Sequence, residues 1–98
     1  MIRMNINELK EKRNEIYHIA SKHGAKHIRI FGSVVTGQAR PDSDVDFLVD
    51  IAPGKSLFDL GGLLMDLRNL LGCEVDVVTE KGLKSRLRHR VLQEAVQL

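Results

Sequence analysis

The sequence contains a single cysteine, no tryptophan and only 4% aromatic residues. Because a disulfide needs two cysteines, Cys73 cannot form one within the chain, and a zinc site built from cysteines would lack its ligands. No apolar run approaches the roughly 20 residues that cross a bilayer, and the first residues show no apolar segment typical of an export signal. These absences argue against a disulfide-stabilised secreted domain and against a membrane-spanning protein, so we expect a cytoplasmic protein.

The charges are nearly balanced, with 15 Lys and Arg against 13 Asp and Glu and a formal net charge of +2. Such a small excess does not by itself indicate nucleic-acid binding. Apolar residues make up 43% of the 98 residues, which is enough for one hydrophobic core. No repeat, low-complexity segment or linker divides the chain. We therefore expect a single domain over residues 1–98.

Hydrophobic periodicity predicts alternating helices and strands. The expected helices span residues 5–22, 57–71 and 82–96, and the expected strands span residues 27–31, 44–51 and 73–79. Ser56 and Asp59 have the spacing of a capping box, Gly72 follows as a stop signal, and a short helical turn is expected after Gly32. The core stripe of the last helix is expected to consist of Leu83, Leu87, Val91, Ala95 and Val96. The predicted fold class is α/β, with about three strands and about four helices.

Two chemical requirements meet in residues 32–46. Gly32 and Ser33 directly follow a strand, where free backbone N–H groups and the Ser33 hydroxyl can face a phosphate, and glycine permits its close approach. Asp44 and Asp46 lie two residues apart on the next strand, so both carboxylates point to one face, about 6.6–6.8 Å apart along the chain. This spacing lets them share divalent cations, and two Mg²⁺ ions held in this way can bind a triphosphate.

Asp76 offers a third carboxylate. If its strand lies beside that of Asp46, Asp76 points to the same face, where it could bind the second metal or take the proton from an attacking hydroxyl. Each feature also has an ordinary explanation, because Asp-x-Asp pairs are usually solvated, Gly-Ser pairs are usually turns and single acids usually lie on the surface. Their order and spacing together favour a site for a nucleotide and metal.

The combined motif is Gly-Ser, ten residues, Asp-x-Asp and a later Val-Asp-Val. It resembles the DNA polymerase beta-like nucleotidyltransferase superfamily, and the size and layout are similar to the minimal nucleotidyltransferase (MNT) antitoxins of HEPN/MNT toxin–antitoxin pairs. The resemblance covers nearly the whole chain. It implies a small mixed sheet flanked by helices, ATP as substrate and two Mg²⁺ ions as cofactors.

The resemblance also implies a role for each matching residue. The nucleotide would be bound by Gly32, Ser33 and Ser43, while the metal ligands and catalytic triad would be Asp44, Asp46 and Asp76. The reaction would move AMP from ATP to a hydroxyl and release pyrophosphate. In toxin–antitoxin members of the family, the acceptor is a tyrosine of the HEPN partner, a ribonuclease that is silenced by the modification. We therefore expect a protein adenylyltransferase that acts as an antitoxin.

One departure from the family pattern favours an alternative. Family members often carry Arg before the second Gly of the motif, whereas this chain has Thr36 before Gly37, and a hydroxyl cannot replace a guanidinium. Arg40 could substitute only if the loop folds back. A catalytically weak antitoxin that neutralises its partner by contact is therefore one alternative. A transferase for a small molecule such as an aminoglycoside is another, although the short chain offers no second wall for such a substrate.

A basic cluster stands in the last predicted helix and consists of Lys81, Lys84, Arg86, Arg88 and Arg90. The simplest explanation is a solvated outer face. The functional alternatives are a docking surface for an acidic partner or RNA, or contact of Lys84 and Arg88 with the triphosphate. No aromatic residues interleave for base stacking, so direct nucleic-acid binding is not expected. Because the chain has no room for an acceptor domain, we expect a partner protein or an oligomer, and no membrane partner.

Overall fold

The computed structural model of the chain describes residues 5–36 and 44–98. Its helices are α1 (Ile6–Glu11), α2 (Arg13–Lys22), α3 (Ser33–Thr36), α4 (Leu57–Leu71), the 3-10 turn η1 (Glu80–Gly82) and α5 (Ser85–Glu94). Its strands are β1 (Ala25–Phe31), β2 (Val45–Ile51), β3 (Val75–Thr79) and β4 (Val96–Gln97). The α/β class expected from the sequence is confirmed. No helix in these described ranges is long and apolar enough to cross a bilayer.

The strands form one mixed sheet in the order β3-β2-β1-β4. Strand β1 runs antiparallel to both β2 and β4, whereas β2 and β3 run parallel. The sequence predicted about three strands and missed β4, because two residues are too few to show an alternating pattern. The parallel pairing of β2 with β3 is the feature that positions the candidate site.

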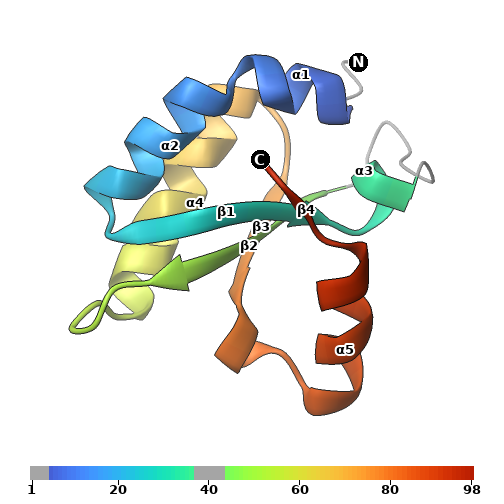
Figure 1. The fold of residues 1–98 in the computed structure, drawn as a ribbon. Coiled ribbons are helices and arrows are strands. Elements are labelled where there is room, and N and C mark those ends of the chain that lie inside the picture. The colour runs from blue at the N-terminus through green and yellow to red at the C-terminus, as the bar shows by residue number, and fades with distance from the viewer. Residues whose placement is uncertain (1–4, 37–43) are drawn as a thin grey trace.

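Helices cover the two faces of the sheet unequally. Figure 1 shows α1, α2 and α4 on one face and α5 on the other. The main core cluster lies with the larger layer and includes Leu9, Ile16, Ile28, Ile30, Phe47, Val49, Leu63 and Leu67. Leu48 and Val91 are also buried but lie outside this cluster. Since side chains alternate along β2, Leu48 faces the opposite side from Phe47 and Val49, where α5 packs.

Helix α4 begins and ends as the sequence predicts. The Ser56 N–H donates to Asp59 Oδ2 at 2.8 Å, and the Phe58 N–H donates to Ser56 Oγ at 3.2 Å, which completes the capping box. Gly72 ends the helix in the left-handed region at φ 68°. These two signals depend only on neighbouring residues, so they can be read without knowledge of the tertiary structure.

The prediction of one helix over 5–22 was wrong in detail. Lys12 adopts φ −95° and ψ 10°, so it ends α1 and precedes α2. Its N–H still donates to the carbonyls of Glu8 and Leu9, at 3.3 and 3.1 Å. The two short helices bury Leu9 and Ile16 completely.

The last helix is shorter than predicted, and part of its expected stripe is exposed. Helix α5 ends at Glu94 because Ala95 turns to extended geometry (ψ 136°), and Val96 then pairs with Ile30 in the sheet. The Leu98 N–H donates to the Ile28 carbonyl at 3.0 Å, so sheet pairing outweighs helical periodicity here. Val91 is buried, whereas Leu87, one turn earlier on the helix, is 45% exposed.

Candidate active site

The strand register brings the predicted acidic residues together. Asp46 on β2 lies opposite Asp76 on the parallel strand β3 and opposite Phe31 on the antiparallel strand β1. Residues directly opposite each other in a sheet share a face, so the Asp46 and Asp76 carboxylates point to the same side. Asp44 precedes β2 by one residue, and Asp44 and Asp76 are both exposed. The condition stated for Asp76, that its strand lies beside that of Asp46, is therefore met.

The carboxylate of Asp46 carries the clearest electrostatic signature of this site. Burial, followed by the negative charges of Asp76 and then Asp44, raises the pKa of Asp46 from 3.8 to about 6. The charges of Asp76 and Asp44 therefore oppose the ionisation of Asp46, and none of these three acids forms an ion pair among residues 5–36 and 44–98. This arrangement favours a cation or a proton at Asp46.

Gly32 is needed for a reason that the sequence did not reveal. It follows β1 with φ 81°, and a Cβ atom at this position would collide with the carboxylate of Asp46. The sequence explained Gly32 by the close approach of a phosphate. The structure shows that the glycine also leaves room for the Asp46 side chain, so the Gly-Ser turn and the acidic cluster are parts of one site.

Ser33 begins α3, so the short helical turn predicted after Gly32 is confirmed. The Gly32 carbonyl accepts hydrogen bonds from the N–H groups of Val35 and Thr36, at 3.0 and 3.1 Å. The first N–H groups of a helix have no partner within it, and Gly32, the residue directly before α3, lies against the Asp46 carboxylate. Thr36 is exposed and donates from Oγ1 to the Ser33 carbonyl at 3.5 Å. Ser43, like Arg40, lies outside the described residues.

The acidic cluster is not a preformed metal centre. In the ranges 5–36 and 44–98, no group of three or more His, Cys, Asp or Glu side chains is arranged to hold a metal ion. Asp44 and Asp76 are exposed, so their side chains can rotate without breaking packing contacts. Their oxygen donors are of the kind that Mg²⁺ prefers.

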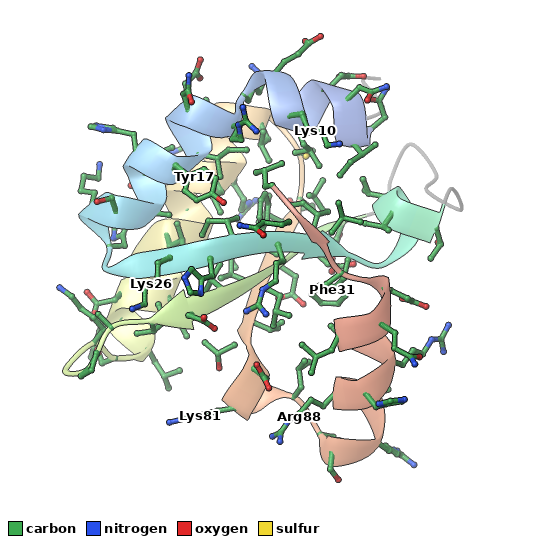
Figure 2. The ribbon with its side chains drawn as sticks, in the orientation of Figure 1. Lys10, Tyr17, Lys26, Phe31, Lys81 and Arg88 are labelled. Atoms are coloured by element: carbon green, nitrogen blue, oxygen red, sulfur yellow. The ribbon has the colours of Figure 1, made fainter. Side chains whose placement is uncertain are left out.

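The residues of the basic cluster lie in different environments in the structure. Lys84, Arg86 and Arg90 are exposed, as a solvated face requires, whereas Arg88 is half-buried. Arg88 points from α5 toward η1, the turn that carries Lys81 (Figure 2). Both residues line a cavity of about 760 Å³ at the C-terminal ends of β2 and β3, far from the start of β2. The sequence placed these cations on one helix but could not show that two of them border a cavity.

Comparison with known proteins gives one family. The family described as "Nucleotidyltransferase domain" matches residues 6–98. A Methanocaldococcus jannaschii protein, assigned by name as a protein adenylyltransferase, is 45% identical over 95 residues, which cover 97% of this chain and 99% of the relative. The protein adenylyltransferase MntA of Thermococcus cleftensis is 42% identical over 78 residues, covering 80% of this chain and 79% of the relative.

Solved structures agree with this family. A protein assigned as a minimal nucleotidyltransferase has a TM-score of 0.86 and 43% identity, and each chain is covered completely. A chain from the complex of a tri-AMPylated Shewanella oneidensis HEPN toxin with an MNT antitoxin has a TM-score of 0.68 and 21% identity, covering 90% of this chain and 69% of that chain. The second similarity shows the fold alone.

Proposed function

Because the chain belongs to the nucleotidyltransferase domain family, we propose that it transfers AMP from ATP to a hydroxyl group of a protein. The names of its relatives support this chemistry, since both describe protein adenylyltransferases. The fold shared with a HEPN–MNT complex supports a HEPN-type toxin as the acceptor and an antitoxin role for this chain. The resemblance of the sequence motif to MNT antitoxins leads us to propose a tyrosine as the modified residue. The proposed functional unit is one domain over residues 1–98, and the acceptor hydroxyl belongs to the partner protein.

The observation that carries the proposal is that the acidic cluster and the Gly-Ser turn lie side by side at the start of β2. Asp46 lies opposite Asp76, and its carboxylate lies against Gly32, directly before α3. A triphosphate whose phosphates contact the start of α3 would therefore place a phosphorus atom beside the acidic cluster. In our proposal Gly32, Ser33 and Ser43 bind the nucleotide.

Divalent cations fit the acidic cluster. Asp76 and Asp44 place negative charge beside the half-buried Asp46 and raise its pKa, and hard oxygen donors suit Mg²⁺. We assign Asp44, Asp46 and Asp76 as the residues that would hold two Mg²⁺ ions. When bound, the ions would supply positive charge to the phosphate oxygens during an in-line displacement.

The reaction balances with one bond formed and one broken. The acceptor oxygen bonds to the α-phosphorus, the bond between this phosphorus and the bridging oxygen to the β-phosphorus breaks, and pyrophosphate leaves. The hydroxyl proton must pass to a base. Asp76 is exposed on the same face as Asp46, so it is placed either to take this proton or to complete the metal site.

The experiment is transfer of label from α-³²P-ATP to protein, in a lysate of cells that express the chain with its natural neighbours. We expect one Mg²⁺-dependent labelled protein, identified by its mass, and no label from γ-³²P-ATP. The variant Asp44→Ala/Asp46→Ala should reduce transfer at least about 10³-fold, because it removes shared ligands. The matched control is Glu11→Gln, which changes an exposed acid on α1 and should transfer normally.

The opposite result supports the contact antitoxin. No labelled protein, with a HEPN-type partner bound equally by the wild-type chain and the Asp44→Ala/Asp46→Ala variant, would overturn the transferase proposal. The exposed Thr36, in place of the usual Arg, is the feature that would then explain the lack of activity.

A further inference from the structure

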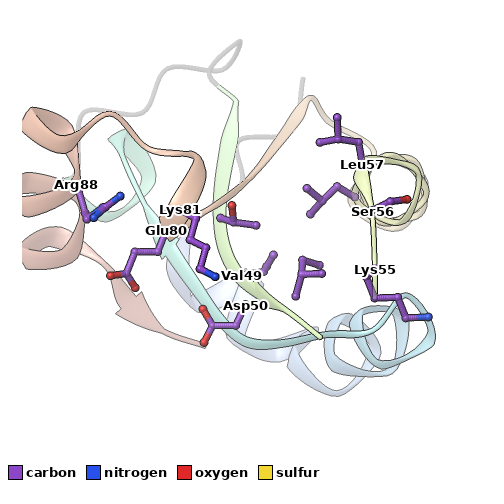
Figure 3. Close-up of a pocket in the computed structure, with 11 residues that line it drawn as sticks. Val49, Asp50, Lys55, Ser56, Leu57, Glu80, Lys81 and Arg88 are labelled. Carbon is purple, nitrogen blue, oxygen red and sulfur yellow. The ribbon is translucent and has the colours of Figure 1, made fainter. Parts of the chain in front are cut away.

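The cavity at the C-terminal end of β2 is a notch between three elements. Strand β3 ends at Thr79, opposite Val49, while β2 continues to Ile51, so the last residues of β2 have no neighbour from β3. Figure 3 shows Val49 and Asp50 between the α4 side, which presents Ser56 and Leu57, and the side of η1 and α5, which presents Lys81 and Arg88. We call this cavity of about 760 Å³ the notch. Its size is in the range of specific ligand sites.

The notch contains positive charge that the described chain does not neutralise. The Nε atom of Arg88 is buried without a hydrogen-bond partner among the described residues. Neither Arg88 nor Lys81 forms an ion pair within residues 5–36 and 44–98. Leaving a buried guanidinium N–H unpaired is costly, and a carboxylate can accept two hydrogen bonds from one guanidinium.

The acidic residues that line the notch do not neutralise its cations, so an incoming carboxylate can still bind them. Asp50 already pairs with Arg29 at 3.0 Å and with His27 at 2.9 Å. Glu80 is the remaining acid, and it stands against three cations, Lys55, Lys81 and Arg88, among the lining residues. The notch therefore retains a positive balance that suits an incoming carboxylate.

The opposite wall is apolar and extends to an unusually exposed rim. Val49, Ile51, Leu57 and Leu60 line the notch, and no aromatic residue does. The lack of an aromatic surface disfavours a nucleobase. Leu57 is 82% exposed, and Phe58 beside it is 93% exposed, as is typical of residues that become buried in a protein interface.

We propose that the notch docks the acceptor protein, by holding one of its acidic side chains against Arg88 and Lys81 while an adjacent apolar side chain packs on Leu57. This inference rests on the proposed function. Asp46 and Asp50 lie four residues apart on the same face of β2, about 13 Å along the strand. A protein that presents a hydroxyl at Asp46 is large enough to fill the notch in the same pose.

The test uses the purified wild-type chain, its purified HEPN-type partner, and charge-reversal variants. Arg88→Glu and Lys81→Glu should each weaken partner binding about tenfold or more, because repulsion replaces attraction. In the transfer assay they should raise the KM for the acceptor by the same factor and leave the KM for ATP unchanged within twofold. The matched control is Arg86→Glu, an exposed cation on the same helix outside the notch, which should change neither value.

Two outcomes would overturn the docking proposal. If Arg88→Glu and Lys81→Glu behave like Arg86→Glu, the notch does not contact the partner. If they raise the KM for ATP instead, the notch belongs to the nucleotide. Binding is measured without ATP, so a partner that binds but is never labelled contradicts only the proposed function, whereas a partner that does not bind contradicts the docking proposal.

A charge exchange separates docking from misfolding. Acidic surface residues of the partner are changed to Lys one at a time and combined with Arg88→Glu. For one such pair, the affinity should be at least about fivefold higher than that of Arg88→Glu with the unchanged partner, which a misfolded variant could not show. If no pair restores affinity, and the thermal unfolding of Arg88→Glu shows that it is folded, the assignment of a carboxylate to the notch is wrong.

Discussion

Each end of strand β2 carries one aspartate, and both aspartates lie on the same face of the sheet. The charges around these two aspartates are opposite in sign. At the start, Asp46 lies with Asp76 and Asp44, and burial together with these charges raises its pKa to about 6. At the end, Asp50 pairs with Arg29 and His27. One acid lies beside two further negative charges, whereas the other forms an ion pair with Arg29 and a hydrogen bond with His27.

The difference separates a functional acid from a structural one. An unopposed cluster of carboxylates costs stability, so its presence is explained by a ligand that supplies positive charge. The pairing of Asp50 needs no ligand and stabilises the paired end of β1 and β2. It also leaves Glu80 as the remaining acid of the notch against Lys55, Lys81 and Arg88, so one end of β2 suits cations and the other suits a carboxylate.

The largest expected loss of stability and transfer comes from placing a side chain in the space that the Asp46 carboxylate occupies. Gly32→Ala adds a Cβ that collides with the Asp46 carboxylate, at a residue with φ 81°. We expect a loss of about 2–3 kcal/mol in the free energy of unfolding from backbone strain and the collision together. We expect transfer to fall about 100-fold, because the displaced carboxylate no longer holds its position. Urea unfolding and the α-³²P-ATP assay measure the two effects.

The control for this prediction is Gly72→Ala. Gly72 also has positive φ, at 68°, but a Cβ there would meet nothing within 4 Å. It should lose about 1 kcal/mol and retain full transfer. If Gly32→Ala loses no more transfer than Gly72→Ala, then contact with Asp46 is not what Gly32 provides.

Local signals predicted most of the fold. The capping box at Ser56, the stop at Gly72 and the alternation around Phe47 each depend on neighbouring residues, and each is confirmed. The errors occur where tertiary contacts decide. Val96 continues a helical pattern in sequence, but it pairs with Ile30, and this partner is 66 positions away along the chain.

The sequence singled out the acids and the Gly-Ser turn of the candidate site, but it did not show their contacts. The spacing of Asp44 and Asp46 and the alternation of β3 would place Asp76 on the same face only if the two strands are neighbours, and the structure supplies that pairing. The collision that excludes a side chain at Gly32 depends on the register between β1 and β2, which spacing does not determine. The notch was missed because it is formed by three separate segments, α4, the end of β2, and η1 with α5.

A smaller effect, with stabilising sign, is expected from removing the charge of Asp46. Asp46→Asn keeps the shape of the side chain but ends its repulsion with Asp76 and Asp44. Without Mg²⁺, near pH 7.5, the variant should be more stable than wild type by about 1–2 kcal/mol, allowing for partial solvent screening of a half-buried group. It should also lose transfer, so stability and activity change in opposite directions.

The pH dependence of this gain follows from the direction of the shift. The folded pKa of about 6 lies above the ordinary value of 3.8, so the folded protein holds the proton more tightly than the unfolded chain. The cost to wild type is therefore full above about pH 7 and disappears as the pH falls toward about 4. Urea unfolding in EDTA at several pH values should show the two proteins converging at low pH. A constant difference between them would mean that Asp46 is not the titrating group.

The smallest expected change in the free energy of unfolding comes from Asp50→Asn, which should destabilise the protein, whereas Asp46→Asn should stabilise it. Asp50→Asn removes the charge that Arg29 and His27 face, and we expect a loss of about 0.5–1 kcal/mol that shrinks with added salt. His27 adds to this loss because it has φ 54° at the irregularity between Lys26 and Arg29, and its contact with Asp50 helps to hold that geometry. Urea unfolding at low and high salt measures the loss of stability and its dependence on salt. If Asp50→Asn instead stabilises the protein as Asp46→Asn does, negative charge is excessive along the whole face of β2. The contrast between a functional and a structural aspartate would then have to be abandoned.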